Sequence, residues 1–400
     1  MKQSIVKTKE GISYLLPFIV ITSLFFLWGF AHSILDVLNK HFQEVLVISK
    51  ARSALVQAVV YGGYFLMALP AGLFMKRFGY RWGVVLGLSL YGIGALMFYP
   101  GSILMSFNFF LFSLFIIGCG LTCLETAANP YVTILGEPET GASRLNLSQS
   151  FNGLGWIVGP FVGGLVIFPE DGSVGDIALP YLAIGCVVLV LAVLFFKLPL
   201  PIIRPDSIPA NKIEGKNTLW HYPHFVWGVI ALFFYVAAQT GINSFFINYV
   251  TEEVPSISNR DAALLLSFGG MGLFMTGRLL GSWLMRRIPA AKLLAACAVG
   301  AITSMILVIL QMDWLSVGAL FACYLFESIM FPTIFALAIR DLGDHTEKAS
   351  SFLIMSIVGG AIAPVGMGLL GEKEMAVGFL IPLICFIFVA FYAFRGYRCK

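Results

Sequence analysis

The most regular feature of this chain is a succession of long apolar stretches separated by short polar segments. A helix needs about 20 apolar residues to cross the roughly 30 Å hydrocarbon core of a bilayer. Most of these stretches reach or approach that length, so the pattern predicts an all-α integral membrane protein with twelve transmembrane helices. The predicted helices cover residues 15–38, 54–75, 83–100, 107–134, 146–168, 178–197, 224–250, 262–285, 292–311, 314–339, 351–371 and 376–394.

An internal repeat relates the first six predicted helices to the last six. Glu125 and Glu327 are each followed five residues later by a proline, and each precedes a similar loop. A constant offset of 207 residues then relates Gly153 to Gly360. Parallel repeats of this kind are typical of the major facilitator fold, in which two six-helix halves are related by pseudo-symmetry.

The only long polar connector lies between the two groups of helices. It covers residues 198–222 and carries four prolines and, counting Lys197 at its start, four basic residues before the seventh predicted helix. We therefore expect an N-terminal six-helix half at 1–197, a cytoplasmic linker at 198–222 and a C-terminal six-helix half at 223–400.

Composition agrees with a membrane protein, and the basic residues indicate its orientation. Hydrophobic residues make up 59% of the chain and charged residues only 12%, whereas soluble domains contain about 25% charged residues. If both termini are cytoplasmic, the segments on that side carry 19 of the 25 Lys and Arg residues. Cytoplasmic loops carry such an excess. We therefore expect a multi-pass plasma membrane protein, in a bacterial inner membrane, with both termini in the cytoplasm.

The motifs that the chain lacks exclude several classes of function. It contains no G-x-x-x-x-G-K-[ST] sequence for nucleotide hydrolysis and no H-E-x-x-H sequence for a catalytic metal. Its seven cysteines show no C-x-x-C spacing, so neither a disulfide framework nor a metal site is indicated. We expect a transporter rather than an enzyme, without cofactor, nucleic acid or obligate protein partner. An enzyme embedded in the membrane is the competing class.

Two carboxyl residues within predicted helices are candidates for proton binding. Glu125 lies deep in the fourth predicted helix, where burial favours the neutral form of a carboxyl group. The alternative for Glu125 is a structural hydrogen bond to a neighbouring helix. Asp36 lies near the outer end of the first helix, and the helical rise of 1.5 Å per residue makes a solvated helix end as plausible as a site.

A second pair of charges lies in the C-terminal half. Glu327 occupies the repeat position of Glu125, and Arg278 lies within the eighth predicted helix. Either the two glutamates face one cavity, or Glu327 pairs with Arg278. Arg278 could instead extend to the cytoplasmic surface. We assign Arg278 and Glu327 as structural or coupling charges.

Amide side chains are candidates for sugar binding, because one amide both donates and accepts hydrogen bonds. On the fifth predicted helix they recur every third residue and share one face, and the seventh helix carries a similar set. Hydrogen bonding between helices is the alternative role. The amides are Asn146, Gln149 and Asn152 on the fifth helix and Gln239, Asn243 and Asn248 on the seventh, with Asn129 on the fourth and the weaker aromatic candidates Trp28, Tyr64 and Trp156.

Several stretches resemble the fucose permease family of major facilitator sugar:proton symporters. The most specific is Leu124-Glu125-Thr126-Ala127-Ala128-Asn129-Pro130, which continues through Arg144-Leu145-Asn146-Leu147-Ser148-Gln149-Ser150-Phe151-Asn152. Leu24-Phe25-Phe26-Leu27-Trp28 with Asp36 is similar to the first helix of that family. Ala238-Gln239-Thr240, Gly277-Arg278 and Phe331-Pro332-Thr333-Ile334-Phe335 agree as well.

The resemblance implies a secondary active transporter that imports a monosaccharide (a hexose, deoxyhexose or N-acetylhexosamine) with a proton by alternating access. It implies that Asp36 and Glu125 couple proton movement and that Gln149 and Asn152 contact the sugar. We expect Asn129, Gln239 and Asn243 to contribute to the same substrate site, within a lipid bilayer.

Three departures from the family pattern leave the substrate open. Asn243 and Phe331 stand where a fucose carrier is expected to have larger or hydroxylated aromatic residues, and Glu327 is an addition. Relatives carry glucose, galactose or N-acetylglucosamine. Sodium-coupled sugar symport is the alternative within this class, and an exporter of drug-like or lipid solutes is the alternative from another class.

Overall fold

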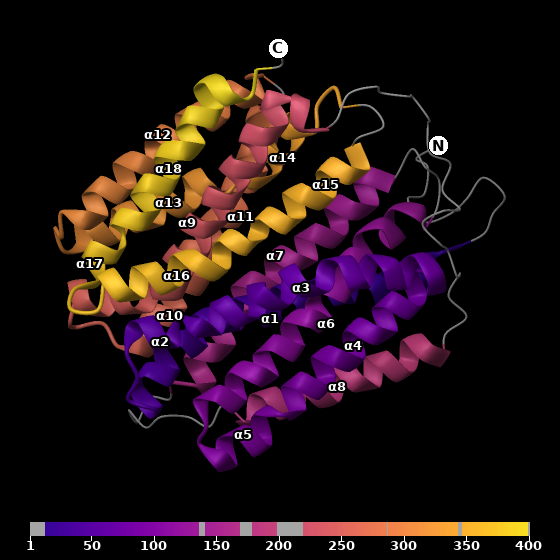
Figure 1. The fold of residues 1–400 in the computed structure, drawn as a ribbon. Helices are drawn as coiled ribbons and strands as arrows, with labels where there is room; N and C mark the ends of the chain where they lie inside the picture. Colours follow the sequence, from indigo (N-terminus) through magenta and orange to yellow (C-terminus); the bar gives the residue numbers. More distant parts are fainter. Residues whose placement is uncertain are drawn as a thin grey trace. The chain divides into compact units, whose positions relative to one another are not determined.

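The computed structural model describes residues 13–135, 141–168, 178–197, 219–285, 287–342 and 346–398, and helices account for nearly all of them (Figure 1). Within these residues, eleven helical segments are long and apolar enough to cross a membrane. The fifth predicted span, α7 (Gly141–Val166), is 26 residues long but is not among the eleven. Its first half contains Ser148, Gln149, Ser150 and Asn152, which explains its lower hydropathy. The prediction of an all-α membrane protein is confirmed.

The chain forms two compact units, Met1–Leu35 with Gly62–Pro209 and Asp36–Tyr61 with Ala210–Lys400. Helices α1 (Leu15–Val45) and α3 (Leu55–Phe78) therefore each contribute one part to the first unit and one part to the second. The first unit also holds α4 (Tyr80–Leu96), α5 (Phe98–Leu104), α6 (Phe107–Ile134), α7 and α8 (Ala178–Lys197). The predicted boundary between sequence halves lies mostly outside the described residues and stays a prediction.

The second unit contains the remaining helices, and several of its membrane spans are divided into two or three short helical segments. They are α2 (Lys50–Ser53), η3 (Leu219–His221), α9 (Pro223–Glu253), α10 (Asn259–Leu264), η4 (Leu265–Met271), α11 (Gly272–Leu284), α12 (Ala290–Ile309), α13 (Trp314–Glu327), α14 (Met330–Ala338), α15 (Thr346–Met355), η6 (Ser356–Val358), α16 (Gly359–Leu370), α17 (Met375–Gly378), α18 (Leu380–Phe391) and η7 (Tyr392–Gly396).

Close packing in the first unit depends on glycine. Helix α4 packs against α6 and α8, and a Cβ atom added to Gly120 of α6 would lie 2.6 Å from the main-chain nitrogen of Tyr91. A Cβ atom added to Gly87 of α4 would similarly lie 2.8 Å from the carbonyl oxygen of Gly120. Small residues let transmembrane helices approach this closely and gain van der Waals contact.

Two spans of the second unit are interrupted near their middle. The eighth span passes from α10 through the π-helical segment η4 into α11. The tenth span stops at Glu327, the end of α13, and resumes at Met330, the start of α14. Interrupted helices and π-helical turns are frequent at binding sites of transporters and enzymes, and here both interruptions lie next to predicted site residues.

The turn between the ninth and tenth predicted spans is confirmed. Helix α12 ends at Ile309 and α13 begins at Trp314, and Gln311 and Asp313 between them have positive φ angles of 52° and 49°. The Ser316 hydroxyl accepts a hydrogen bond from the Met312 amide at 2.8 Å and donates one to the Leu307 carbonyl at 2.7 Å. These bonds satisfy main-chain groups that a reversal inside an apolar stretch would otherwise leave unpaired.

The outward faces of the helices are apolar. On α3, Leu66, Leu69 and Leu73 are 61%, 63% and 70% exposed, and their spacing places them along one side of the helix. Such a row is unfavourable in water but suits contact with lipid chains, because the bilayer interior is as apolar as leucine.

A buried arginine secures the end of α6. Arg144, in the first turns of α7, has no exposed surface, and its Nε donates a hydrogen bond to the Val132 carbonyl at 3.0 Å. Val132 is in the last turn of α6, where carbonyl groups lack helical partners and a positive charge is favourable. Arg144 is one of the 19 basic residues expected on the cytoplasmic side, and the structure gives it this buried contact.

We expect Arg144→Met to destabilise the protein by about 1.5–3 kcal/mol, because it removes the hydrogen bond from a charged donor to the Val132 carbonyl and leaves that carbonyl only the long 3.4 Å bond from the Leu135 amide. The measurement is the thermal unfolding midpoint of the purified protein in detergent. Arg287→Met is the control, since Arg287 is exposed and its guanidinium lies over Trp283. Equal midpoints for the two variants would contradict a structural role for Arg144.

Candidate functional site

The first unit contains a chain of three titratable side chains from three helices. His32 of α1 lies 2.8 Å from Tyr64 of α3, measured from the ring Nε2 to the hydroxyl oxygen. The Tyr64 hydroxyl is in turn close enough to Glu125 of α6 to hydrogen-bond with its carboxyl group. His32 and Tyr64 are buried, whereas Glu125 retains partial exposure. A carboxyl group in such a setting can take up a proton and pass it along hydroxyl and imidazole groups.

Aromatic rings surround this chain. The Trp156 ring of α7 stacks on the His32 ring with centroids 5.9 Å apart, and Trp28 meets His32 edge-on at 6.4 Å. Trp28, Tyr64 and Trp156 were weak candidates in the sequence. His32 was not a candidate at all, although its position four residues after Trp28 and four before Asp36 places the three residues on one face of α1.

The amides of the first unit divide into two groups. Gln149 Nε2 donates to Asn129 Oδ1 at 3.3 Å, and both side chains keep partial exposure. Asn152 is buried, and its Nδ2 donates to the Phe25 carbonyl of α1 at 3.1 Å. Gln149 and Asn129 therefore remain suited to a solute, whereas the donor of Asn152 already joins two helices. The Asn146 side chain lies outside the described residues.

Asp36 is buried in the second unit. The residue is 3% exposed, and Oδ1 accepts a hydrogen bond from Gln57 Nε2 at 2.9 Å. Within the described residues, Oδ2 has no hydrogen-bond partner. The solvated helix end considered from the sequence is therefore wrong. Helical rise gives the depth of a residue along α1 but not which neighbours cover it.

Asn243 and Tyr324 form a polar contact in the interior of the second unit. The Tyr324 hydroxyl of α13 donates to Asn243 Oδ1 of α9 at 2.9 Å. The Tyr324 ring lies against Gly270 in the π-helical segment η4, where an added Cβ atom would be 3.2 Å from the ring. Gln239, one helical turn before Asn243, is partly exposed. Tyr324 was not identified from the sequence, because nothing distinguished it from the other 13 tyrosines.

Arg278 and Glu327 do not form the ion pair that was one of the alternatives left open by the sequence. Arg278 Nε donates to the Ser328 carbonyl at 3.3 Å, and its guanidinium carbon lies 4.7 Å from the centre of the Phe274 ring. Glu327 is fully buried, and in the described part of the chain neither of its carboxyl oxygens has a hydrogen-bond partner. Arg278 therefore binds the main chain where the tenth span is interrupted.

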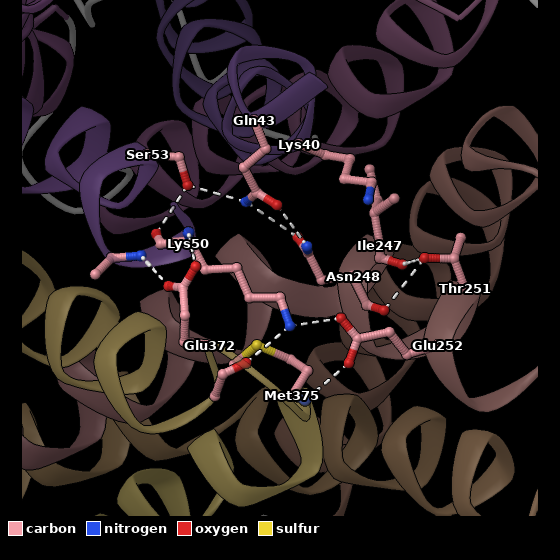
Figure 2. A network of polar contacts seen from close by, with 12 residues as sticks. Lys40, Gln43, Lys50, Ser53, Ile247, Asn248, Thr251, Glu252, Glu372 and Met375 are labelled. Carbon is pink, nitrogen blue, oxygen red and sulfur yellow. Dashed lines mark hydrogen bonds and ion pairs between the residues drawn. The ribbon is translucent and has the colours of Figure 1, made fainter. Parts of the chain in front are cut away.

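A polar network joins the end of α1 and helix α2 to α9 and to the segment after α16 (Figure 2). Lys50 Nζ lies 2.6 Å from Glu252 Oε1 and donates to the Gly371 carbonyl at 2.7 Å. Gln43 and Asn248 exchange amide hydrogen bonds, the shorter of them 2.7 Å from Asn248 Nδ2 to Gln43 Oε1. Asn248 is therefore committed to this network and not to the interior of the unit.

Main-chain contacts complete the network. The Glu372 carboxylate accepts weak hydrogen bonds of 3.4 Å from the amides of Lys50 and Ala51, and Glu252 Oε2 accepts one of 2.8 Å from the Met375 amide. A Cβ atom added to Gly368 of α16 would lie 2.7 Å from the main-chain nitrogen and Cα of Ala51. Helix α2 is thus held against α16 by main-chain contact and by charge.

Among the described residues, no group of three His, Cys, Asp or Glu side chains could hold a metal ion. The titratable chain described above takes His32, Tyr64 and Glu125 from three separate helices.

Comparison with known proteins agrees with this arrangement. The Major Facilitator Superfamily profile matches residues 18–364. The chain is 39% identical over 384 residues to a glucose/galactose transporter of Brucella abortus, covering 94% of this chain and 93% of the relative. It is 37% identical over 409 residues to the L-fucose-proton symporter of Escherichia coli, covering 95% and 93%.

A solved structure gives the same result. The crystal structure of a variant of the E. coli fucose:proton symporter FucP is 35% identical, covers 97% of this chain and 100% of that one, and superposes with a TM-score of 0.70. The matches span nearly the whole chain. The protein therefore belongs to the Major Facilitator Superfamily, a family of transporters rather than enzymes, and within it to the fucose permease family of sugar:proton symporters.

Proposed function

We propose that this protein imports a neutral monosaccharide together with a proton by alternating access. The observation that carries the proposal is the chain His32–Tyr64–Glu125, a carboxyl group connected to an imidazole through a hydroxyl and bordered by the Trp156 ring. The relatives are named as glucose/galactose transporters and L-fucose-proton symporters, which supports both a sugar substrate and a proton as the coupling ion.

Glu125 is the first candidate for carrying the proton. Its partial exposure gives it access to water in this conformation. When water is excluded, an ionised carboxylate loses its hydration, so the closed states of the cycle favour the protonated side chain. Asp36 is the second candidate, because it is buried with one oxygen paired to Gln57. Protonation removes a charge that the closed protein would otherwise have to carry.

We propose that the sugar is bound by amide side chains whose hydrogen-bonding groups are not all used within the protein. These are Gln149 and Asn129 in the first unit and Gln239 and Asn243 in the second, with Asn152 positioning α7 against α1. Sugar hydroxyls both donate and accept, as amides do, and aromatic rings such as that of Trp156 suit the apolar face of a hexose. None of these amide and aromatic contacts requires a carboxylate on the substrate, so we expect a neutral sugar.

We further propose that the network around Lys50 lies on the extracellular side and closes that side in this conformation. The proposal follows from the excess of basic residues in the other set of loops, with both termini then cytoplasmic. Residues 36–61 belong by sequence to the first six helices but pack within the second unit. Polar contacts and ion pairs suit an interface that opens and closes, because they can be exchanged for water.

The function is tested by measuring external pH in lightly buffered, de-energised cells that express the protein. We expect addition of D-glucose, D-galactose or L-fucose to make the medium alkaline, because each imported sugar brings a proton with it. A protonophore should abolish the signal, and cells carrying an empty vector are the control.

The other outcomes are equally informative. Exchange of labelled sugar without alkalinisation would indicate sodium coupling or uniport instead of proton symport. Neither alkalinisation nor exchange with any neutral sugar would contradict the assignment of sugars as substrates, and an exporter of another solute would then be favoured.

A further inference from the structure

The end of helix α13 carries a carboxyl group that the transport cycle above does not use. Glu327 is the last residue of α13, has no exposed surface, and lies where the tenth span is interrupted. Its carboxyl oxygens have no hydrogen-bond partner within the described residues. Its main-chain carbonyl, in contrast, accepts a hydrogen bond from the Tyr235 hydroxyl at 3.1 Å.

The charged side chain that interacts electrostatically with Glu327 is that of Arg278 in α11, but its hydrogen bond goes to another group. Its Nε donates to the Ser328 carbonyl, the residue directly after Glu327, at a long 3.3 Å. A guanidinium has five N–H donors and suits bidentate binding of a carboxylate. Arg278 thus lies beside a carboxyl group that it does not bind, held by one weak contact to the main chain and by the Phe274 ring.

The other titratable groups around Glu327 are Tyr235 of α9 and Tyr324 and Cys323 of α13. The Tyr235 hydroxyl is bonded to the main-chain carbonyl of Glu327, and the Tyr324 hydroxyl is bonded to Asn243. Cys323 is buried, and its thiol is a weak donor. None of these groups donates a hydrogen bond to the Glu327 carboxyl.

An ionised carboxylate is strongly unfavourable in this position. It would be removed from water without a hydrogen bond, and the guanidinium of Arg278 is bonded to the Ser328 carbonyl and not to this carboxylate. It would also lie at the C-terminal end of a helical segment, where the helix dipole disfavours negative charge. The neutral, protonated carboxylic acid avoids both penalties.

We propose that Glu327 is a second proton-binding carboxyl of the transport cycle and that Arg278 releases its proton by moving from the Ser328 carbonyl to the Glu327 carboxylate. In the conformation described here, Glu327 holds a proton and Arg278 binds the main chain. While the extracellular side is still closed, Arg278 then pairs with the carboxylate and the proton passes to water on the cytoplasmic side. Reloading takes a proton from water on the extracellular side and returns Arg278 to Ser328.

The sequence repeat supports this role. Glu327 occupies the position of Glu125, with a proline five residues later in both halves. The proposal rests on the proposed function, since it assigns a further proton to the same sugar symport.

The test is the proton-to-sugar ratio of purified protein in proteoliposomes, measured with labelled D-glucose, D-galactose or L-fucose by balancing a sugar gradient against a known proton gradient. We expect Glu327→Gln to lower the ratio by about one proton per sugar, because each carboxyl site carries one ion with the substrate. We expect Arg278→Gln to lower it equally, because Glu327 then keeps its proton throughout. Asp341→Asn is the control, since the Asp341 side chain is 73% exposed, and should leave the ratio unchanged.

A ratio that is the same in wild type and Glu327→Gln overturns the proposal, and a ratio unchanged in Arg278→Gln overturns the role of Arg278.

Infrared spectroscopy gives a readout that needs no transport. The wild-type spectrum should contain the C=O stretch of a buried protonated carboxyl that Glu327→Gln lacks, and its absence from wild type would also overturn the proposal. If wild type moves no proton with any sugar while that band is present, the proposed function has failed and not the protonation of Glu327. If Glu327→Gln does not fold, Arg278→Gln and the wild-type spectrum decide.

Discussion

Glu125→Gln is expected to abolish uphill accumulation of sugar while sugar exchange across the membrane continues. Glutamine keeps the size of the side chain and can still hydrogen-bond to Tyr64, but it has no proton to bind or release. A permanently neutral side chain lets the carrier change conformation without a proton. In a tenfold proton gradient the accumulation ratio should therefore fall from about 10 or more to about 1. The measurement is labelled sugar uptake in energised cells, with counterflow in de-energised cells for exchange.

The pH dependence of uptake should change in the same variant. In wild type, a lower external pH should speed sugar entry, because it supplies the proton that enters with the sugar. In Glu125→Gln, downhill entry should no longer respond to external pH. Glu374→Gln is the matched control, since Glu374 is an exposed carboxyl residue and should retain wild-type accumulation. Retained accumulation in Glu125→Gln would show that another group couples the proton.

The sequence predicted the number, type and approximate position of the membrane helices because span length and hydropathy are local properties. It also indicated Glu125 as a candidate site residue, since a charge so far into an apolar stretch marks a functional position. The sequence did not identify the hydrogen-bond partners of Glu125. Tyr64 and His32 come from two other helices, and only packing determines which side chains of those helices face α6.

The structure differs from the expectations drawn from the sequence for the same reason, namely that contacts between helices are not encoded locally. The tenth span was predicted as a single span over residues 314–339, but it is interrupted at Ser328 and Ile329. There Arg278 donates a hydrogen bond to the Ser328 carbonyl and Tyr235 donates one to the Glu327 carbonyl. Asn248 was grouped with amides that could bind sugar, yet its partner is Gln43, 205 residues away. Hydrogen bonds between segments so distant in sequence leave no pattern within either one.

Gly368→Ala is expected to open the contact between α2 and α16 and to inhibit sugar uptake. The added methyl group would lie 2.7 Å from main-chain atoms of Ala51, and main chain cannot turn aside as the end of a side chain can. Overpacking of this kind costs about 1–3 kcal/mol, which corresponds to a shift of about 5–150-fold between two conformations. The arrangement with α2 held on α16 should become rarer by that factor, and a transporter that seldom closes this side completes few cycles.

The measurement uses Ser53→Cys, because Ser53 lies in α2 with no exposed surface. In intact cells, a membrane-impermeant maleimide should label this cysteine about 5–150-fold faster when Gly368→Ala is also present. Gly366→Ala on the same helix is the matched control. Its added Cβ atom would meet only the terminal methyl group of Ile381, at 2.9 Å, and the side chain can move away. An unchanged labelling rate in Gly368→Ala would show that the contact between α2 and α16 does not close the extracellular side. Labelling only from the cytoplasmic side, in inverted membrane vesicles, would reverse the proposed orientation and place the Lys50 network at the inner surface.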